Sequence, residues 1–164
     1  MCDMKQVPPT EATEKTAPAA EPVNSLGVLM AMVRSELARA LETEFAAQNL
    51  DLSFMQYLIL KKAKQLGAVS ATELARAVEL DGGAMTRQLD QLERKGYLRR
   101  APHALDRRAL RIELTEAGAR MWKDTAFICG DRVMTAAQSS LSATERLQLN
   151  DYLERVLRTL RDRT

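Results

Sequence analysis

Hydrophobic residues beyond the first two dozen positions recur at steps of three and four, which is the spacing of one face of an α-helix. The first such run begins near Ser25 and has six apolar members: Leu26, Met30, Val33, Leu37, Leu41 and Phe45. A second run begins near Ser53 and ends at Gly67, which suits a left-handed helix end after a lysine-rich last turn. The pattern predicts two successive amphipathic helices.

Two shorter helices are predicted next, with Asp81-Gly82-Gly83 as the break between them. The first opens with the capping box Ser70-Ala71-Thr72-Glu73 and reaches Val78. The second runs to about Lys95 and stops at Gly96. Its inward face carries three apolar residues at steps of four and three: Met85, Leu89 and Leu92. A glycine-containing break of this length predicts a tight turn between two packed helices.

The hydrophobic period changes to two after Gly96, which indicates a β-hairpin. Leu98-Arg99-Arg100 begins the first strand, and Pro102 to Leu105 form the tip. Leu110, Ile112 and Leu114 alternate with more polar residues in the returning strand. Arg107 and Arg108 stand at the start of this strand, so the hairpin presents two adjacent guanidinium groups near its tip.

Two more helices are predicted after Thr115. The first spans roughly Glu116 to Ser139, with Met121, Trp122, Ile128 and Val133 as its apolar residues. The second opens with the capping box Ser142-Ala143-Thr144-Glu145. Its apolar face comprises Leu149, Tyr152, Leu153, Val156, Leu157 and Leu160. The fold class is therefore mainly α with a small β-hairpin wing, a winged helix-turn-helix flanked by further helices.

Composition narrows the class of protein. Residues 1–22 hold four of the five prolines and few large apolar residues, which predicts a disordered tail. No apolar run approaches the roughly eighteen residues of a membrane span, and no secretory signal is visible. Two cysteines, Cys2 and Cys129, make no disulfide framework. We therefore expect a cytoplasmic protein without a membrane partner.

The net charge of +2 conceals an uneven distribution. Residues 60–115 contain 12 Lys and Arg against 7 Asp and Glu, a net charge of +5, whereas residues 1–59 carry a net charge of −4. The positive excess falls on the predicted helix-turn-helix and hairpin. A polyanion such as double-stranded DNA is the partner that this distribution favours.

The residues around the predicted turn suit entry into a DNA groove. Gly82, Gly83 and Ala84 are small enough for close approach, and the next turn offers hydrogen-bond donors. We expect seven DNA contacts: Ser70, Thr72, Thr86, Arg87, Gln88, Arg107 and Arg108. Two alternatives stay open, because Ser70 can serve only as a helix cap and arginines on a hairpin can be simply solvated.

Four motifs carry a resemblance to a known family. They are Glu73-Leu74-Ala75, Met85 to Leu98, Asp106-Arg107-Arg108-Ala109 and Leu114-Thr115-Glu116-Ala117-Gly118. Through them the chain resembles the MarR family of bacterial transcriptional regulators from about Leu26 to Leu160. The resemblance implies an obligate homodimer that binds palindromic operators, usually as a repressor released by a small molecule. It also implies that Arg108 enters the minor groove and that Asp106 orients an arginine.

The resemblance also divides the chain and suggests an effector. It implies a dimerisation helix over 23–50, a winged helix-turn-helix over 51–115 and C-terminal dimerisation helices over 116–164, after the tail 1–22. The effector expected at the family level is a phenolic or aromatic acid. Its candidate pocket residues are Met30, Arg34, Phe54, Tyr57 and Trp122, for which ordinary core packing is the alternative. The wing tip departs from the family, which often has acidic residues where this chain has Pro102-His103-Ala104-Leu105.

The sequence leaves three other functions to consider beside a DNA-binding regulator. A redox-sensing thiol at Cys129 is one, although a buried structural cysteine is the plainer interpretation. A winged helix that binds proteins instead of DNA is the second. An enzyme is disfavoured, because the sequence has no nucleophile–base pair, no paired catalytic carboxylates and no phosphate-binding glycine loop. His103 is the single histidine, so neither a metal site nor a cofactor is expected.

Overall fold

The computed structural model describes residues 25–102 and 110–163. The predicted tail 1–22, with Cys2, lies outside the described residues. So do most of the predicted wing tip, including His103, and the two predicted DNA contacts Arg107 and Arg108.

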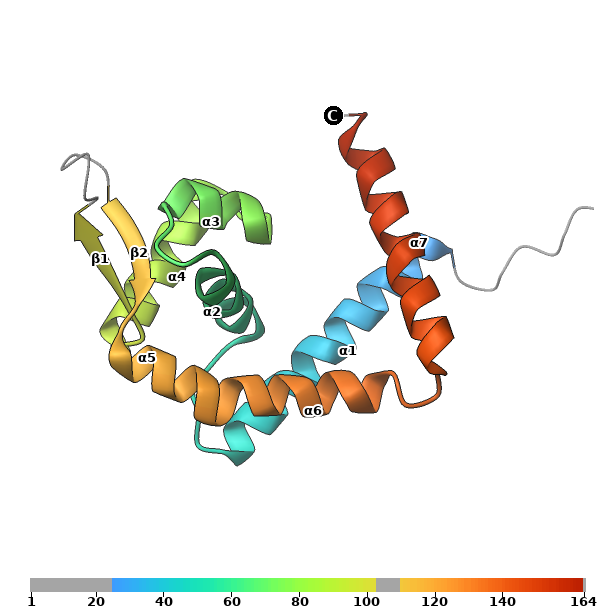
Figure 1. Ribbon diagram of the computed structural model, residues 1–164, viewed down its shortest axis with the longest axis horizontal. Helices are drawn as coiled ribbons and strands as arrows, with labels where there is room; N and C mark the ends of the chain where they lie inside the picture. Colours follow the sequence, from blue (N-terminus) through green and yellow to red (C-terminus); the bar gives the residue numbers. More distant parts are fainter. Residues whose placement is uncertain (1–24, 103–109, 164) are drawn as a thin grey trace, which may run out of the picture.

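The described residues are mainly helical, as predicted, with one two-stranded sheet (Figure 1). In chain order the elements are α1 (Leu26–Ala47), α2 (Phe54–Leu66), α3 (Ala71–Val78), α4 (Gly82–Arg94), β1 (Leu98–Pro102), β2 (Leu110–Leu114), α5 (Glu116–Met121), the π-helical segment η1 (Trp122–Ala126), α6 (Phe127–Ala137) and α7 (Ala143–Arg161). Helices α2, α3 and α4 gather beside the hairpin, and α5 to α6 form one long rod that leads from the hairpin toward α7 (Figure 1).

The hairpin forms as the alternating pattern predicts. Strands β1 and β2 pair antiparallel, with Leu98 opposite Leu114 and Pro102 opposite Leu110. Strand β2 also pairs on its other edge with the segment before α3. There the backbone N–H of Val69 donates to the carbonyl of Ile112 at 3.1 Å, and the reverse bond is 2.6 Å. These bonds fix the start of α3 against the hairpin.

Side-chain caps start the helices at the positions that the sequence indicates. Ser70 and Ser142 each form a complete capping box, with Glu73 and Glu145 respectively. Ser53 forms a third box with Gln56 at the start of α2. Each box satisfies N–H groups that a helix start would otherwise leave unpaired.

The turn between α3 and α4 is displaced from its predicted position. Gly82 and Gly83 are the first residues of α4, because the carboxylate of Asp81 accepts the N–H of Ala84 at 2.8 Å and caps the helix one residue before them. The left-handed residue of the turn is Glu79, with a φ of 56°. The prediction that Asp81-Gly82-Gly83 forms the break was therefore wrong by two to three residues.

The long helix predicted over 116–139 is interrupted by one π-helical stretch. A π turn contains more residues than an α turn, so it rotates the register of everything that follows. Ala126 and Cys129 are buried beyond it, whereas Phe127 and Ile128 are exposed. Ile128 does not join the inward apolar face on which a regular helix would place it.

We call helices α2, α3 and α4 with the hairpin of β1 and β2 the winged unit, and its core lies where the three helices meet the strands. Its fully or almost fully buried members include Leu60 of α2, Leu74 of α3, Met85 and Leu92 of α4, and Ile112 of β2. The inward face predicted for α4 is confirmed, since Met85, Leu89 and Leu92 are each at most 2% exposed. A second part of the core joins Leu41 and Phe45 of α1 to Tyr57 and Trp122.

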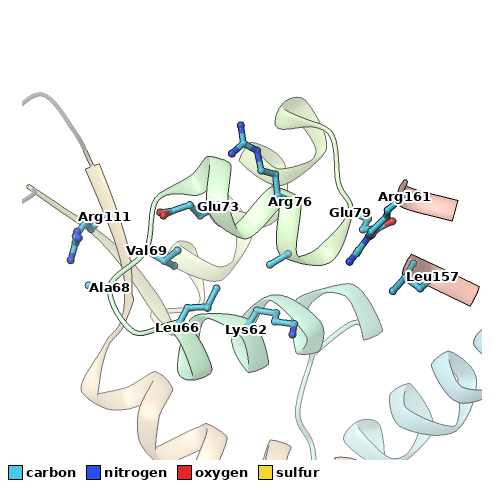
Figure 2. Close-up of a pocket in the computed structure, with 11 residues that line it drawn as sticks. Lys62, Leu66, Ala68, Val69, Glu73, Arg76, Glu79, Arg111, Leu157 and Arg161 are labelled. Carbon is cyan, nitrogen blue, oxygen red and sulfur yellow. The ribbon is translucent and has the colours of Figure 1, made fainter. Parts of the chain in front are cut away.

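Helix α7 buries none of its residues in the single chain. Its last turn lies beside the winged unit, where Arg161 pairs with Glu79 at 2.5 Å (Figure 2). A cleft of about 1110 Å³ lies between the end of α7 and the winged unit, and its apolar lining includes Leu66 and Val69. Four cationic side chains from four elements also line it: Lys62, Arg76, Arg111 and Arg161.

Candidate nucleic-acid interface

The first turns of α4 present an exposed surface of small and polar residues. Gly82 and Gly83 are exposed, and a Cβ added at Gly82 would meet nothing within 4 Å. Thr86 is exposed one turn later, and its hydroxyl donates to the carbonyl of Gly82 at 2.8 Å. This end of the helix can therefore approach a flat or concave partner closely, with the hydroxyl oxygen of Thr86 at the surface.

Arg87 lies on the same exposed surface as the capping carboxylate. Both groups flank Gly83. A Cβ added at Gly83 would lie 3.8 Å from a terminal nitrogen of Arg87 and 3.3 Å from a carboxylate oxygen of Asp81. The pKa of Asp81 is lowered, chiefly by the hydrogen bond from the N–H of Ala84 and also by the positive charge of Arg87. The Arg87 guanidinium thus lies near the helix start, and among the described residues no ion pair to it is found.

Ser70 is occupied by its capping role. Its hydroxyl accepts the N–H of Glu73 at 3.2 Å and donates to the Glu73 carboxylate at 2.7 Å. The same carboxylate accepts the backbone N–H of Ser70 at 2.9 Å. Ser70 therefore caps α3, whereas Thr72 is exposed in the first turn of that helix. A phosphate contact from either residue stays a prediction.

Gln88 differs from its neighbours on α4. It is only partly exposed, and its side-chain carbonyl oxygen is buried with no hydrogen-bond partner among the described residues. Gln88 lines a polar hollow between α4 and the start of α2, together with Gln91 and Lys95. This side of α4 faces α2, so Gln88 is less available to an outside partner than Thr86 or Arg87.

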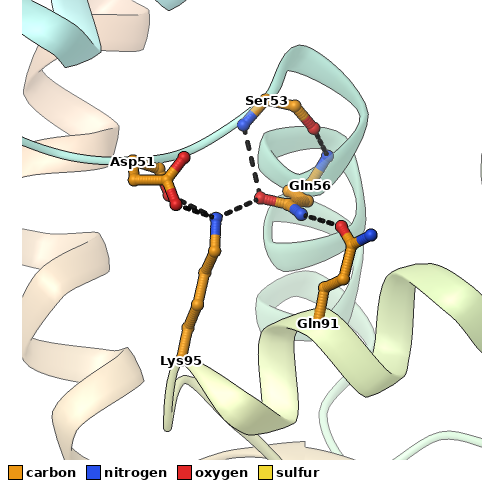
Figure 3. A network of polar contacts seen from close by, with 5 residues as sticks. All are labelled: Asp51, Ser53, Gln56, Gln91 and Lys95. Carbon is orange, nitrogen blue, oxygen red and sulfur yellow. Dashed lines mark hydrogen bonds and ion pairs between the residues drawn. The ribbon is translucent and has the colours of Figure 1, made fainter.

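A polar network fastens the far end of α4 to the start of α2 (Figure 3). The ammonium of Lys95 donates to the backbone carbonyl of Asp51 at 2.6 Å and to the amide oxygen of Gln56 at 3.0 Å. It also pairs with the Asp51 carboxylate at 2.9 Å. Gln56, which is only 3% exposed, extends the network to α4, because its amide nitrogen donates to the Gln91 amide oxygen at 2.7 Å. Sequence reasoning missed this anchor, for which the one signal was a glutamine inside the apolar start of α2.

The arginines of the hairpin have partners within the chain. Arg99 pairs with Glu113 on the opposite strand at 3.0 Å. Arg100 pairs with Asp90 at 2.7 Å and with Glu93, both on α4. The pKa of Arg100 is raised, mainly by the hydrogen bond to Asp90. Arg107 and Arg108 lie outside the described residues, so their expected contacts stay predictions.

The five candidate effector residues fall into two places. Tyr57 and Trp122 are buried and stack with ring centroids 5.3 Å apart, and Phe54 is half-buried at the start of α2. Met30 and Arg34 lie on the exposed N-terminal half of α1. The ring pair belongs to the core that joins α2 to α5 and η1, as the core-packing alternative expects.

The described residues were also compared with the requirements of a metal site, a membrane span and a reactive thiol. Within 25–102 and 110–163 there is no cluster of three or more His, Cys, Asp or Glu side chains placed to hold a metal ion. In the same part of the chain no helix is both long enough and apolar enough to cross a membrane. Cys129 is 2% exposed, and burial raises the pKa of its thiol.

Comparison with known proteins supports the DNA-binding interpretation of this geometry. Residues 52–110 match the model of the MarR family. The multiple antibiotic resistance protein MarR of Escherichia coli strain K12 is 30% identical over 132 residues, which are 80% of this chain and 90% of that protein. The regulator PecS of Dickeya dadantii is 34% identical over 101 residues, 60% of this chain and 59% of PecS.

Solved structures agree with the sequence comparison. A cysteine-to-serine variant of E. coli MarR complexed with operator DNA superposes with a TM-score of 0.72 at 29% identity, covering 80% of this chain and 93% of that one. The resemblance therefore extends over the flanking helices as well as the helix-turn-helix and the wing. This chain belongs to the MarR family of winged helix-turn-helix, DNA-binding transcriptional regulators.

Proposed function

We propose that this protein is a homodimeric repressor that binds a palindromic operator and is released from it by a small molecule. The observation that carries the proposal is the placement of α4. One face of this helix is buried through Met85, Leu89 and Leu92, its far end is fastened by Lys95, and its first turns stay exposed. A helix presented in this way suits entry into the major groove.

Each predicted DNA contact receives a role in this proposal. Thr86 and Arg87 contact base edges or phosphates from α4, and Thr72 contacts a phosphate from the start of α3. Ser70 supports this contact by capping α3. Gln88 contributes least, because its carbonyl oxygen is turned inward. Arg107 and Arg108 of the wing reach the neighbouring minor groove.

The proposed dimer rests on apolar residues that the single chain leaves uncovered. On α1 the exposed set comprises Leu26, Val28, Leu29, Met30, Met32 and Val33. On α7 it comprises Leu147, Leu149, Tyr152, Leu157 and Leu160. Many exposed apolar residues on two helices favour an interaction site, and a second copy would place two α4 helices symmetrically for two half-sites.

The proposed effector is a phenolic or aromatic acid. The buried rings of Tyr57 and Trp122 stack where α2 meets the rod of α5, η1 and α6, and Phe54 lies half-buried at the start of α2. Met30 and Arg34 would join them from α1, with the guanidinium as the partner for a carboxylate. An effector bound there would move the winged unit relative to α1, and so change the spacing of the two α4 helices.

The DNA contacts are tested by fluorescence anisotropy on a duplex selected by the protein from genomic fragments. We expect Arg87→Ala to weaken binding by about tenfold or more, with a shallower salt dependence if the contact is to phosphate. Arg120→Ala is the matched control, since it removes the same charge from α5. Equal losses in the two variants would contradict the assignment of α4 as the reading helix.

Repression and release are tested with a reporter placed behind that duplex. Deleting the gene for this protein should raise reporter expression, and a fall instead would make the protein an activator. Effector binding is followed through Trp122, the sole tryptophan of the chain. An aromatic acid such as benzoate that changes this fluorescence and lowers DNA affinity supports the proposed pocket. The two readouts should respond over the same concentrations, and a fluorescence change without loss of DNA affinity would contradict release.

A further inference from the structure

We propose that Arg100 is a positioning residue that fixes the wing against the reading helix α4, rather than a residue that contacts DNA. This inference rests on the proposed function, because it assumes that α4 and the wing bind one DNA duplex together. Arg100 lies on β1, in a region whose net charge of +5 would otherwise suggest a phosphate contact.

The contacts of Arg100 join two different elements. One terminal nitrogen of its guanidinium donates to the Asp90 carboxylate at 2.7 Å, and the other donates to the Glu93 carboxylate. The second oxygen of Glu93 accepts the backbone N–H of Arg100 at 3.3 Å. Asp90 and Glu93 are three residues apart on α4, so they share one face of that helix. The side chain and the backbone of Arg100 are thus both tied to α4.

The guanidinium suits this role because its donors are fixed in a planar fork. A fork can hold two carboxylates at defined angles, whereas the ammonium of a lysine is a point charge that fixes no orientation. The side chain of Arg100 is 28% exposed, against 63% for its neighbour Arg99. Partial burial weakens competition from water, so these ion pairs hold their geometry better than open surface pairs.

The carboxylates add a second reason. Asp90 and Glu93 lie on the helix that is proposed to enter the DNA groove, where uncompensated negative charge would repel phosphates. Arg100, on the wing, offsets the negative charge of these two carboxylates, and they in turn offset its positive charge. A guanidinium engaged in this way has little capacity left for a phosphate, which argues against direct contact.

The position of Arg100 between the wing and α4 gives its ion pairs a role in DNA binding. Helix α4 and the wing must enter adjacent grooves at the same time, so the angle between them decides whether both contacts form. Among the described residues, Arg100 supplies the ion pairs that join β1 to α4. Arg99, by contrast, pairs with Glu113 inside the hairpin, and among the described residues it forms no ion pair with α4.

The test measures affinity for the duplex selected by the wild-type protein, as a function of salt, in a set of variants. Arg100→Met and Arg100→Lys remove the fork, and Arg99→Met is the control that removes an equal charge from the same strand. Asp90→Asn with Glu93→Gln removes the two carboxylates. Adding Arg100→Met to that pair completes a cycle that isolates the coupling between the arginine and the acids.

We expect Arg100→Met to lower affinity by about tenfold without changing the slope of log affinity against log salt, because no phosphate contact is lost. Arg100→Lys should lose nearly as much, although it keeps the charge. Arg100→Met should cost little more once Asp90 and Glu93 are neutral. Hydroxyl-radical footprints should show weakened protection where the wing lies and retained protection where α4 lies.

The opposite results overturn the inference. A rescue by Arg100→Lys, a salt slope lowered by about one, or an undiminished loss in the background without the two acids would each identify Arg100 as a phosphate contact. Thermal unfolding followed by circular dichroism checks that the variants fold, and the lysine variant keeps the test valid if the methionine variant does not. Failure of the wild-type protein to select any duplex would instead overturn the proposed function itself.

Discussion

Gly118 shows at the scale of one residue how closely α5 packs on the end of the hairpin. A Cβ added there would lie 2.0 Å from the carbonyl oxygen of Tyr97 and 2.8 Å from its carbonyl carbon. That carbonyl is fixed, because it accepts the N–H of Thr115 at 3.1 Å. Backbone atoms held by such a bond have little room to move away from a methyl group.

We therefore expect Gly118→Ala to lower the free energy of unfolding by about 2 kcal/mol or more, as overpacking of a tight contact does. Replacing glycine by alanine within a helix ordinarily raises stability by up to about 1 kcal/mol, so the sign is reversed here. Urea denaturation measures the change. Gly27→Ala in α1 is the control, since its Cβ would meet nothing within 4 Å. Equal stabilities of the two variants would refute the close contact.

Cys129 offers a second test at this scale. Burial raises the pKa of its thiol, with a smaller contribution from the charge of Glu44, and Arg132 opposes both. The thiolate is the reactive form, so a raised pKa and 2% exposure predict slow chemistry. In a Cys2→Ser variant, Cys129 should react with Ellman's reagent slowly in the native protein and rapidly in denaturant. Fast native labelling with loss of DNA binding would support the redox-sensing alternative instead.

At the scale of elements, three helix starts depend on ionised carboxylates. The pKa values of Glu73, Asp81 and Glu145 are all lowered, in each case chiefly by hydrogen bonds that cap α3, α4 or α7. A carboxyl group with a lowered folded pKa contributes stability above its unfolded pKa and loses it as pH falls through the folded value. Acid should therefore weaken these three helix starts together.

We expect the free energy of unfolding to fall as pH is lowered below about 4, the ordinary range of these carboxyl groups. Glu73→Gln keeps an oxygen for the capping bonds but cannot titrate, so its stability should depend less on pH over the same interval. Chemical denaturation across a pH series measures this. Glu154→Gln, at an exposed position within α7, is the control. An unchanged pH dependence in Glu73→Gln would contradict the capping origin.

The capping residues also show how far elements could be predicted from sequence. Ser70 and Ser142 marked helix starts correctly, because a cap is local and needs only residues within one turn. The turn before α4 was misplaced, since a glycine pair resembles a break even where a carboxylate cap has already started the helix. The π-helical stretch after Met121 carried no local signal. The ion pairs of Arg100 were not predicted, because its partners lie seven and ten residues away on another element.

At the scale of the whole molecule, three connections join the winged unit to the rest. In the core, the ring of Tyr57 in α2 packs against Phe45 of α1 and Trp122 of η1. The rod of α5, η1 and α6 leads directly from β2 and packs across α1 (Figure 1). The end of α7 contacts the turn before α4 through the Arg161–Glu79 pair. These connections lead to α1 and α7, whose apolar residues the single chain leaves exposed, so the position of α4 depends on how these two helices are covered.

The proposed dimer supplies that cover, and disrupting it should disable DNA binding without touching α4. We expect Leu149→Asp combined with Tyr152→Asp to yield monomers in analytical ultracentrifugation, because paired charges on an apolar interface are costly to bury. Affinity for the full operator should fall by about a hundredfold or more, since the second half-site no longer adds to the first. Affinity for a single half-site should change little. The control is Gln148→Asp with Asn150→Asp, which adds the same charge at polar positions of α7 and should leave the dimer intact. Monomers in both double variants would mean that the added charge alone, and not the loss of apolar contacts, opposes assembly.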